Sequence, residues 1–135
     1  MTLSLIIGLS LGFVSILFSR LLKQVDEPLF YGLMLAVIGA LYVGFTWTDT
    51  TSFIINCIQA FFFGTIAYLG IKKSMYFMAV GFVLHGAFDF VYGLFPLPDL
   101  RPPHYDVFCL SVDWVIGIYL FMLAYRQANA VTKKY

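Results

Sequence analysis

Apolar residues run in long stretches along the chain, with polar residues, prolines and charges gathered between them. Cutting the chain at the polar clusters leaves five apolar segments, at residues 3–22, 29–47, 52–71, 75–95 and 106–125. Each has about the twenty residues that an α-helix needs to cross a bilayer. Because a helix satisfies its backbone hydrogen bonds within its own segment, helices are favoured over a barrel of strands. The pattern predicts an all-α fold: one transmembrane domain over residues 1–135, a bundle of five transmembrane helices.

Composition supports this interpretation. Of the 135 residues, 61% are hydrophobic and only 11% are charged, whereas a globular domain is usually about one quarter charged. The net charge is +1, and the basic residues lie at the ends of apolar segments rather than along one stripe. This distribution excludes a nucleic-acid-binding surface.

The first apolar segment differs from a secretory signal peptide. It has no basic residue before it, it is longer than a signal-peptide core, and Arg20 and Lys23 follow it. We expect it to be a retained helix.

The distribution of Lys and Arg predicts the orientation. Seven of the eight basic residues fall on one side of five helices, and only Arg101 falls on the other. Since basic residues favour the cytoplasmic side, we expect the N-terminus and residues 96–105 outside, and the C-terminal tail and residues 26–28 inside. The simplest setting is a bacterial inner membrane, crossed several times.

Small residues predict where helices touch, because close backbone approach drives helix association in lipid. One face of the first segment and one of the second carry them: Gly8, Gly12, Ser15 and Ser19, then Gly32, Ala36 and Gly39. We expect helix interfaces there, ahead of the alternative of a substrate groove. Aromatic residues near segment ends are expected to face lipid or the membrane boundary: Tyr31, Trp47, Tyr76 and Tyr125.

Ionisable residues within the apolar segments point to a site. His85, Asp89 and Asp113 lie inside predicted helices, where a carboxylate costs on the order of 3 kcal/mol. His85 and Asp89 are four residues apart and share a helix face, with Tyr92 following on the same side. Two other faces are also polar: Asp106, Cys109, Asp113 and Gly117 on the last helix, and Ser52, Asn56, Gln59 and Phe63 on the third.

Depth estimates bring these groups together. At about 1.5 Å of rise per residue, Asp89 and Asp113 lie about 9 and 10 Å below the outer surface, and His85 about 15 Å below it. Asn56 and Gln59 fall in the same layer, at about 6 and 10 Å. We predict one inward-facing polar site open to the outer side, with Asn56, Gln59 and Tyr92 as substrate-binding residues.

The segment at residues 96–103 contains four prolines, which stiffen it and remove backbone donors. It could form a lid or rim over the site, with His104 as a fourth ligand or as an acid and base. In the simpler interpretation, the prolines end one helix and start the next, and Asp106 is a helix N-cap. For Asp106 we favour the N-cap.

The run Leu84-His85-Gly86-Ala87-Phe88-Asp89, the proline-rich loop and the later Asp113-Trp114 pair carry a resemblance. They resemble a group of small bacterial integral membrane proteins of unknown function that have a Leu-His-x-x-x-Asp helix and a later intramembrane Asp. The similarity covers about the last third of the chain. It implies that His85, Asp89 and Asp113 form the polar centre of the group.

Three function classes fit these residues. In a metal-dependent hydrolase acting on a lipid or another amphiphile, His85, Asp89 and Asp113 would hold Zn²⁺ or another divalent metal with one position open. In a proton-coupled transporter or binding protein, a homodimer, the carboxylates would exchange protons through His85. In an accessory or assembly subunit the cluster would only join helices, at about 0.6 kcal/mol per hydrogen bond. That gain is small for three ionisable residues, so we favour a functional site.

The remaining candidates are weaker. Cys57 and Cys109 lie at similar estimated depths in a compartment that permits a disulfide, but cysteines within helices are more often buried small residues. His85 and His104 lie too far apart in depth for a bis-histidine haem, and no nucleotide-binding loop or nucleophile elbow occurs. The expected partners are membrane lipids, together with further copies of the chain or a larger membrane complex.

Overall fold

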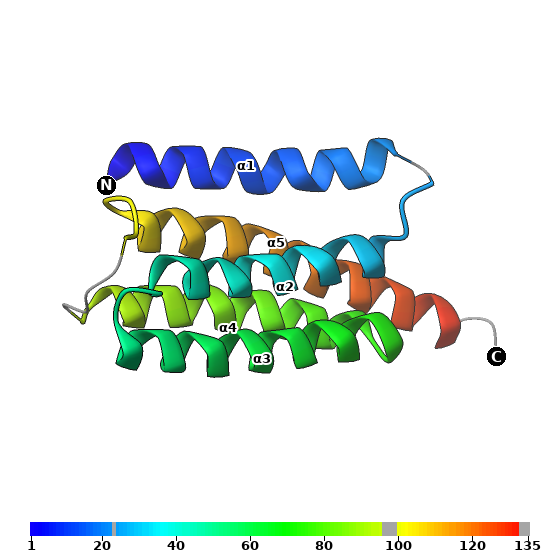
Figure 1. Cartoon of the computed structure of the whole chain (residues 1–135). Coiled ribbons are helices and arrows are strands. Elements are labelled where there is room, and N and C mark those ends of the chain that lie inside the picture. The colour runs from blue at the N-terminus through cyan, green and yellow to red at the C-terminus, as the bar shows by residue number, and fades with distance from the viewer. Residues whose placement is uncertain (23, 96–99, 133–135) are drawn as a thin grey trace.

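Five helices form the part of the chain described by the computed structural model, which comprises residues 1–22, 24–95 and 100–132. They are α1 (Thr2–Leu21), α2 (Glu27–Phe45), α3 (Thr50–Lys72), α4 (Met75–Gly93) and α5 (Tyr105–Thr132), and successive helices run in opposite directions (Figure 1). All five are long and apolar enough to cross a membrane. The predicted all-α fold class is confirmed.

Polar residues that interrupt the apolar pattern also start the helices. The carboxylate of Asp26 accepts a hydrogen bond from the backbone N–H of Leu29 at 3.0 Å, and that of Asp49 accepts one from Ser52 at 2.8 Å. The second bond favours the charged carboxylate and holds the pKa of Asp49 below its ordinary value. Ser74 caps α4 in the same way. These caps satisfy backbone donors that the first turn of a helix leaves free.

The last helix is longer than its apolar segment. α5 continues to Thr132, past the predicted end at Tyr125. Hydropathy falls at Arg126, but Arg, Gln and Ala are good helix formers, so the helical backbone continues.

Glycines bring α1 against α5. A side chain at Gly8 would collide with the side chain of Ser111 and approach the carbonyl oxygen of Phe108 at 2.6 Å, and one at Gly12 would lie 3.0 Å from Val115. In the second helix, Gly32 faces Ile71 and Met78 of α3 and α4. The predicted small-residue interfaces are confirmed.

The molecule is apolar on the inside and on the outside. Buried side chains of α2, α3, α4 and α5 form the core, among them Leu35, Phe63, Phe82 and Ile116. Large apolar side chains also cover the outer surface, as at Phe61, which is 79% exposed. A surface of this kind is suited to lipid. The chain is a multi-pass membrane protein.

One aromatic assignment was wrong. Trp47, Tyr76 and Tyr125 are exposed, as expected for lipid-facing residues, but Tyr31 is fully buried. Its hydroxyl lies 2.7 Å from the Ser19 hydroxyl, and its ring packs edge-on against Phe82. Tyr31 is buried because α1 supplies a hydrogen-bonding partner for its polar end, which its position near a helix end does not reveal.

Candidate functional site

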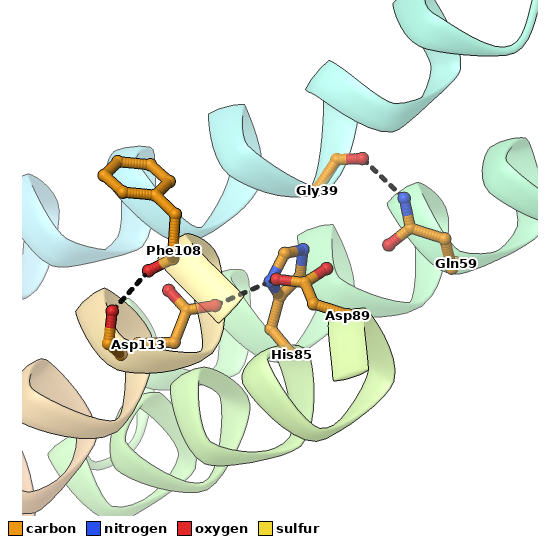
Figure 2. A network of polar contacts seen from close by, with 7 residues as sticks. Gly39, Gln59, His85, Asp89, Phe108 and Asp113 are labelled. Atoms are coloured by element: carbon orange, nitrogen blue, oxygen red, sulfur yellow. Dashed lines mark hydrogen bonds and ion pairs between the residues drawn. The ribbon is translucent and has the colours of Figure 1, made fainter. Parts of the chain in front are cut away.

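The site consists of one histidine and two aspartates from the paired helices α4 and α5 (Figure 2). His85 and Asp89 lie one turn apart on α4, and Asp113 faces them from α5. The Nδ1 atom of His85 lies 2.8 Å from Oδ2 of Asp113 and 3.2 Å from Oδ2 of Asp89. The sequence prediction that these three residues share one layer is borne out by these distances.

Gly86 allows the two helices to approach at this level. A Cβ atom at Gly86 would lie 3.1 Å from Cβ of Asp113 and 2.9 Å from the Trp114 ring. Both separations are tighter than ordinary contact, so a side chain at Gly86 would push α5 outward. Gly86, which lies between His85 and Asp89 in sequence, thus lets α5 bring the Asp113 carboxylate close to α4.

All three side chains are withdrawn from the surface, at 0, 0 and 1% exposure for His85, Asp89 and Asp113. Burying an ionised group costs several kcal/mol unless it is paired and hydrogen-bonded. Oδ2 of Asp89 contacts only the His85 Nδ1 atom that Asp113 also contacts, whereas Oδ1 of Asp89 and Nε2 of His85 have no hydrogen-bond partner within the described part of the chain. The protein therefore leaves one carboxylate oxygen and one imidazole nitrogen of the cluster without a hydrogen-bond partner in its described part.

Aromatic side chains enclose the histidine. The ring of Phe63 packs edge-on against His85 at a centroid separation of 4.7 Å, and Tyr42 and Phe88 lie at 6.3 and 6.4 Å. These walls keep water from the ring and strengthen every electrostatic interaction inside them.

A cation covers the site toward the end of the bundle where α1, α3 and α5 begin. The guanidinium of Arg101 lies 4.7 Å from the centre of the Tyr92 ring and 5.7 Å from that of Tyr42. The backbone N–H of Leu100 donates to the carbonyl of Phe45 and ties this segment to the end of α2. From the sequence, Arg101 was used only to predict the topology. The sequence did contain one signal that Arg101 has a further role, because Arg101 is the single basic residue on its side of the membrane.

The amides on α3 are engaged in helix contacts. Asn56 donates to the backbone carbonyl of Ser52 at 2.9 Å and to the Tyr92 hydroxyl at 3.0 Å. Gln59 donates to the carbonyl of Gly39 on α2 (Figure 2). Substrate binding by Asn56, Gln59 and Tyr92 stays a prediction, and these bonds join α3 to its neighbours.

His104 is not brought into the cluster. It is exposed, lies immediately before α5 and adopts a left-handed backbone conformation with φ of 63°. The N-cap interpretation of Asp106 was wrong, because α5 begins at Tyr105 and places Asp106 inside its first turn, against Gly93 of α4. The prolines at residues 96 and 98 lie outside the described residues. Both cysteines are free.

A second polar cluster at the opposite end was missed. The Tyr119 hydroxyl donates to Oε1 of Glu27 at 3.3 Å, and Nε of Arg20 lies 4.0 Å from the same oxygen. With the bond between Ser19 and Tyr31, these contacts join α1, α2 and α5. Because each partner sits near the end of a different segment, sequence spacing alone does not connect them.

The fold and the site define a class: small five-helix membrane proteins with a buried His-Asp-Asp centre between two paired helices. A family described as a family of unknown function, DUF6010, matches residues 3–126. The chain belongs to this family. Comparison with curated proteins finds no match, and comparison with solved structures finds none either.

Proposed function

We propose that the protein is a metal-dependent membrane hydrolase, with His85, Asp89 and Asp113 holding a divalent ion such as Zn²⁺. The observation that supports this proposal most is the arrangement of the donors. One potential ligand atom from each residue lies within 4.8 Å of the others, all three residues are buried, and Oδ1 of Asp89 has no hydrogen-bond partner among the described residues.

Charge balance supports the same proposal. Two carboxylates carry two negative charges, and a divalent ion with a neutral imidazole brings the total to zero in an apolar interior. Without a metal ion, two charged carboxylates and a protonated histidine would leave one net negative charge in the cluster. Neutral imidazole and carboxylate are ordinary zinc ligands, and three protein ligands leave the fourth position open, as in catalytic zinc sites. When bound, the ion supplies Lewis acidity and a nucleophile at neutral pH.

The protein's own residues would divide the remaining work. His85 and Asp113 fix each other's orientation through their 2.8 Å contact. The rings of Phe63 and Tyr42 exclude bulk water, and Arg101 carries positive charge above the rings of Tyr42 and Tyr92. A cation in this position favours a substrate with a polar or anionic head.

A proton-coupled centre is the second candidate, favoured by the same 2.8 Å contact between His85 and Asp113. A hydrogen bond of this length can hold a proton between the imidazole and the carboxylate without a metal. Metal analysis separates the two candidates.

The test measures bound metal in the detergent-purified protein by elemental analysis, after incubation with zinc and removal of excess. We expect about one ion per chain and a melting temperature that a chelator lowers. His85→Asn should insert and fold but carry no metal, and chelator should leave its melting temperature unchanged. Asp106→Asn is the matched control, a carboxylate of α5 outside the cluster, and should retain the metal. A wild-type protein without metal and without chelator sensitivity would replace the hydrolase proposal with the proton-coupled one.

A further inference from the structure

An apolar pocket lies between the lipid-facing surface and Asp113 of the site. It has a volume of about 190 Å³ and is lined by residues of α1, α2, α4 and α5. Leu11 and Leu41 lie on its walls and are 46 and 42% exposed. Asp113 and Cys109 line its inner part. The pocket thus reaches a carboxylate of the proposed metal centre from the side.

Helix packing explains why the pocket exists. α1 rests on α5 through Gly8 and Gly12, and its direct hydrogen bond to α2 is at the far end, between Ser19 and Tyr31. Along the rest of their length α1 and α2 lie apart, and α5 is seen between them (Figure 1). Leu11 and Ile38, which line the pocket, are near the middle of α1 and α2, at the depth of the lipid chains.

Size and chemistry limit what can occupy this space. A helix with its side chains is about 10–12 Å across, too wide for the pocket. Water is disfavoured, since an apolar cavity of about 150 Å³ stays dry and takes up benzene instead. A single hydrocarbon chain is thin enough and is the solvent at this depth. Its polar end can meet the polar side chains of the lining, which are Tyr105, Cys109 and Asp113.

We propose that this pocket binds one hydrocarbon chain of an amphiphile, which enters laterally between α1 and α2 and brings its polar group to Asp113. As the substrate route of an enzyme this inference rests on the proposed function, whereas chain binding itself requires no metal. The substrate class is then a lipid with at least one unbranched chain, taken directly from the membrane.

The experiment uses the full chain in vesicles of phosphatidylethanolamine and phosphatidylglycerol, with a photoreactive diazirine on a fraction of the acyl chains. Illumination and peptide mapping locate the adducts. We expect adducts on Ile38 and Val112 inside the pocket, and also on Phe61, an exposed residue of α3 that reports contact with the bulk lipid.

Ile38→Trp fills the pocket and should abolish labelling at Val112 while leaving that at Phe61 unchanged. Leu33→Trp is the matched control, since Leu33 is an exposed residue of the same helix outside the pocket, and it should label like the wild type. If Ile38→Trp fails to fold, the smaller change Leu41→Phe and the wild-type adduct map still decide the question.

Absence of labelling at Val112 in the wild type, or labelling there that Ile38→Trp leaves unchanged, would overturn the proposal, even if the protein binds metal. Pocket labelling in a protein without metal would support chain binding while refuting the hydrolase. Failure of the chain-binding proposal can therefore be distinguished from failure of the hydrolase proposal.

Discussion

His85 connects the two carboxylates of the site through a single atom. Its Nδ1 atom contacts both Asp89 and Asp113, so a change at either carboxylate alters the surroundings of the other. Sequence spacing could predict that His85 and Asp89 share a face, and depth could predict Asp113. Neither spacing nor depth could predict that Tyr42 belongs to the site. Tyr42 lies on an apolar helix, and only the folded structure brings its ring against His85 and Arg101.

At this scale the carboxylates should act as one unit. Asp89→Asn and Asp113→Asn should each lose most bound metal, and the double variant should be little worse than either. The coupling free energy in a double-mutant cycle on unfolding should be about 0.5–3 kcal/mol. Melting temperature and metal content provide the measurements.

The pair Asp89→Asn and Asp106→Asn provides the control for this cycle, because Asp106 lies outside the cluster and its effect should add independently. Additive effects for Asp89 and Asp113 as well would show that the carboxylates do not share an ion or a proton.

At the scale of helices, most of the fold follows from the sequence. Apolar length predicts five helices, and small residues predict which faces meet, as Gly8 and Gly12 illustrate. The pairing of partners does not follow, because a glycine face predicts a close neighbour without saying which helix provides it. The contact of α1 with α5, the helix most distant from it in sequence, depends on the complementary shape around Ser111 and Val115.

The glycine contact gives a prediction for helix packing. Gly8→Ala should destabilise the protein by about 1–3 kcal/mol, the usual cost of overpacking, because the new methyl group meets the backbone oxygen of Phe108. Gly44→Ala should be neutral or slightly stabilising, since nothing lies within 4 Å of a Cβ there and Ala favours a helix. Thermal unfolding in detergent measures both, and equal stabilities would contradict the packing described for α1.

For the whole molecule, the alternating helices place chain ends and charges on two sides. Arg20, Lys72, Lys73 and Arg126 lie at the bundle end opposite Arg101. The helix directions make this separation a property of the fold, and the charge rule then predicts that the basic end lies on the cytoplasmic side.

A reporter fused to the C-terminus should therefore be active as a cytoplasmic reporter, and one inserted beside Arg101 should be active only outside. Alkaline phosphatase and a fluorescent protein, compared at both positions, measure this directly. A cytoplasmic result at Arg101 would place the site near the inner surface and reverse the direction from which polar substrates reach it.

The packing of the first helix on the last also affects how the protein is made. α1 leaves the ribosome first, but its partner surface around Ser111 is synthesised roughly one hundred residues later, about 5–20 s at ordinary elongation rates. During that interval the Gly8 and Gly12 face is available to any neighbouring helix in the membrane. Correct assembly therefore depends on α1 remaining near the site of insertion until α5 arrives, and a pause in translation before α5 would lengthen the period in which it can pair wrongly.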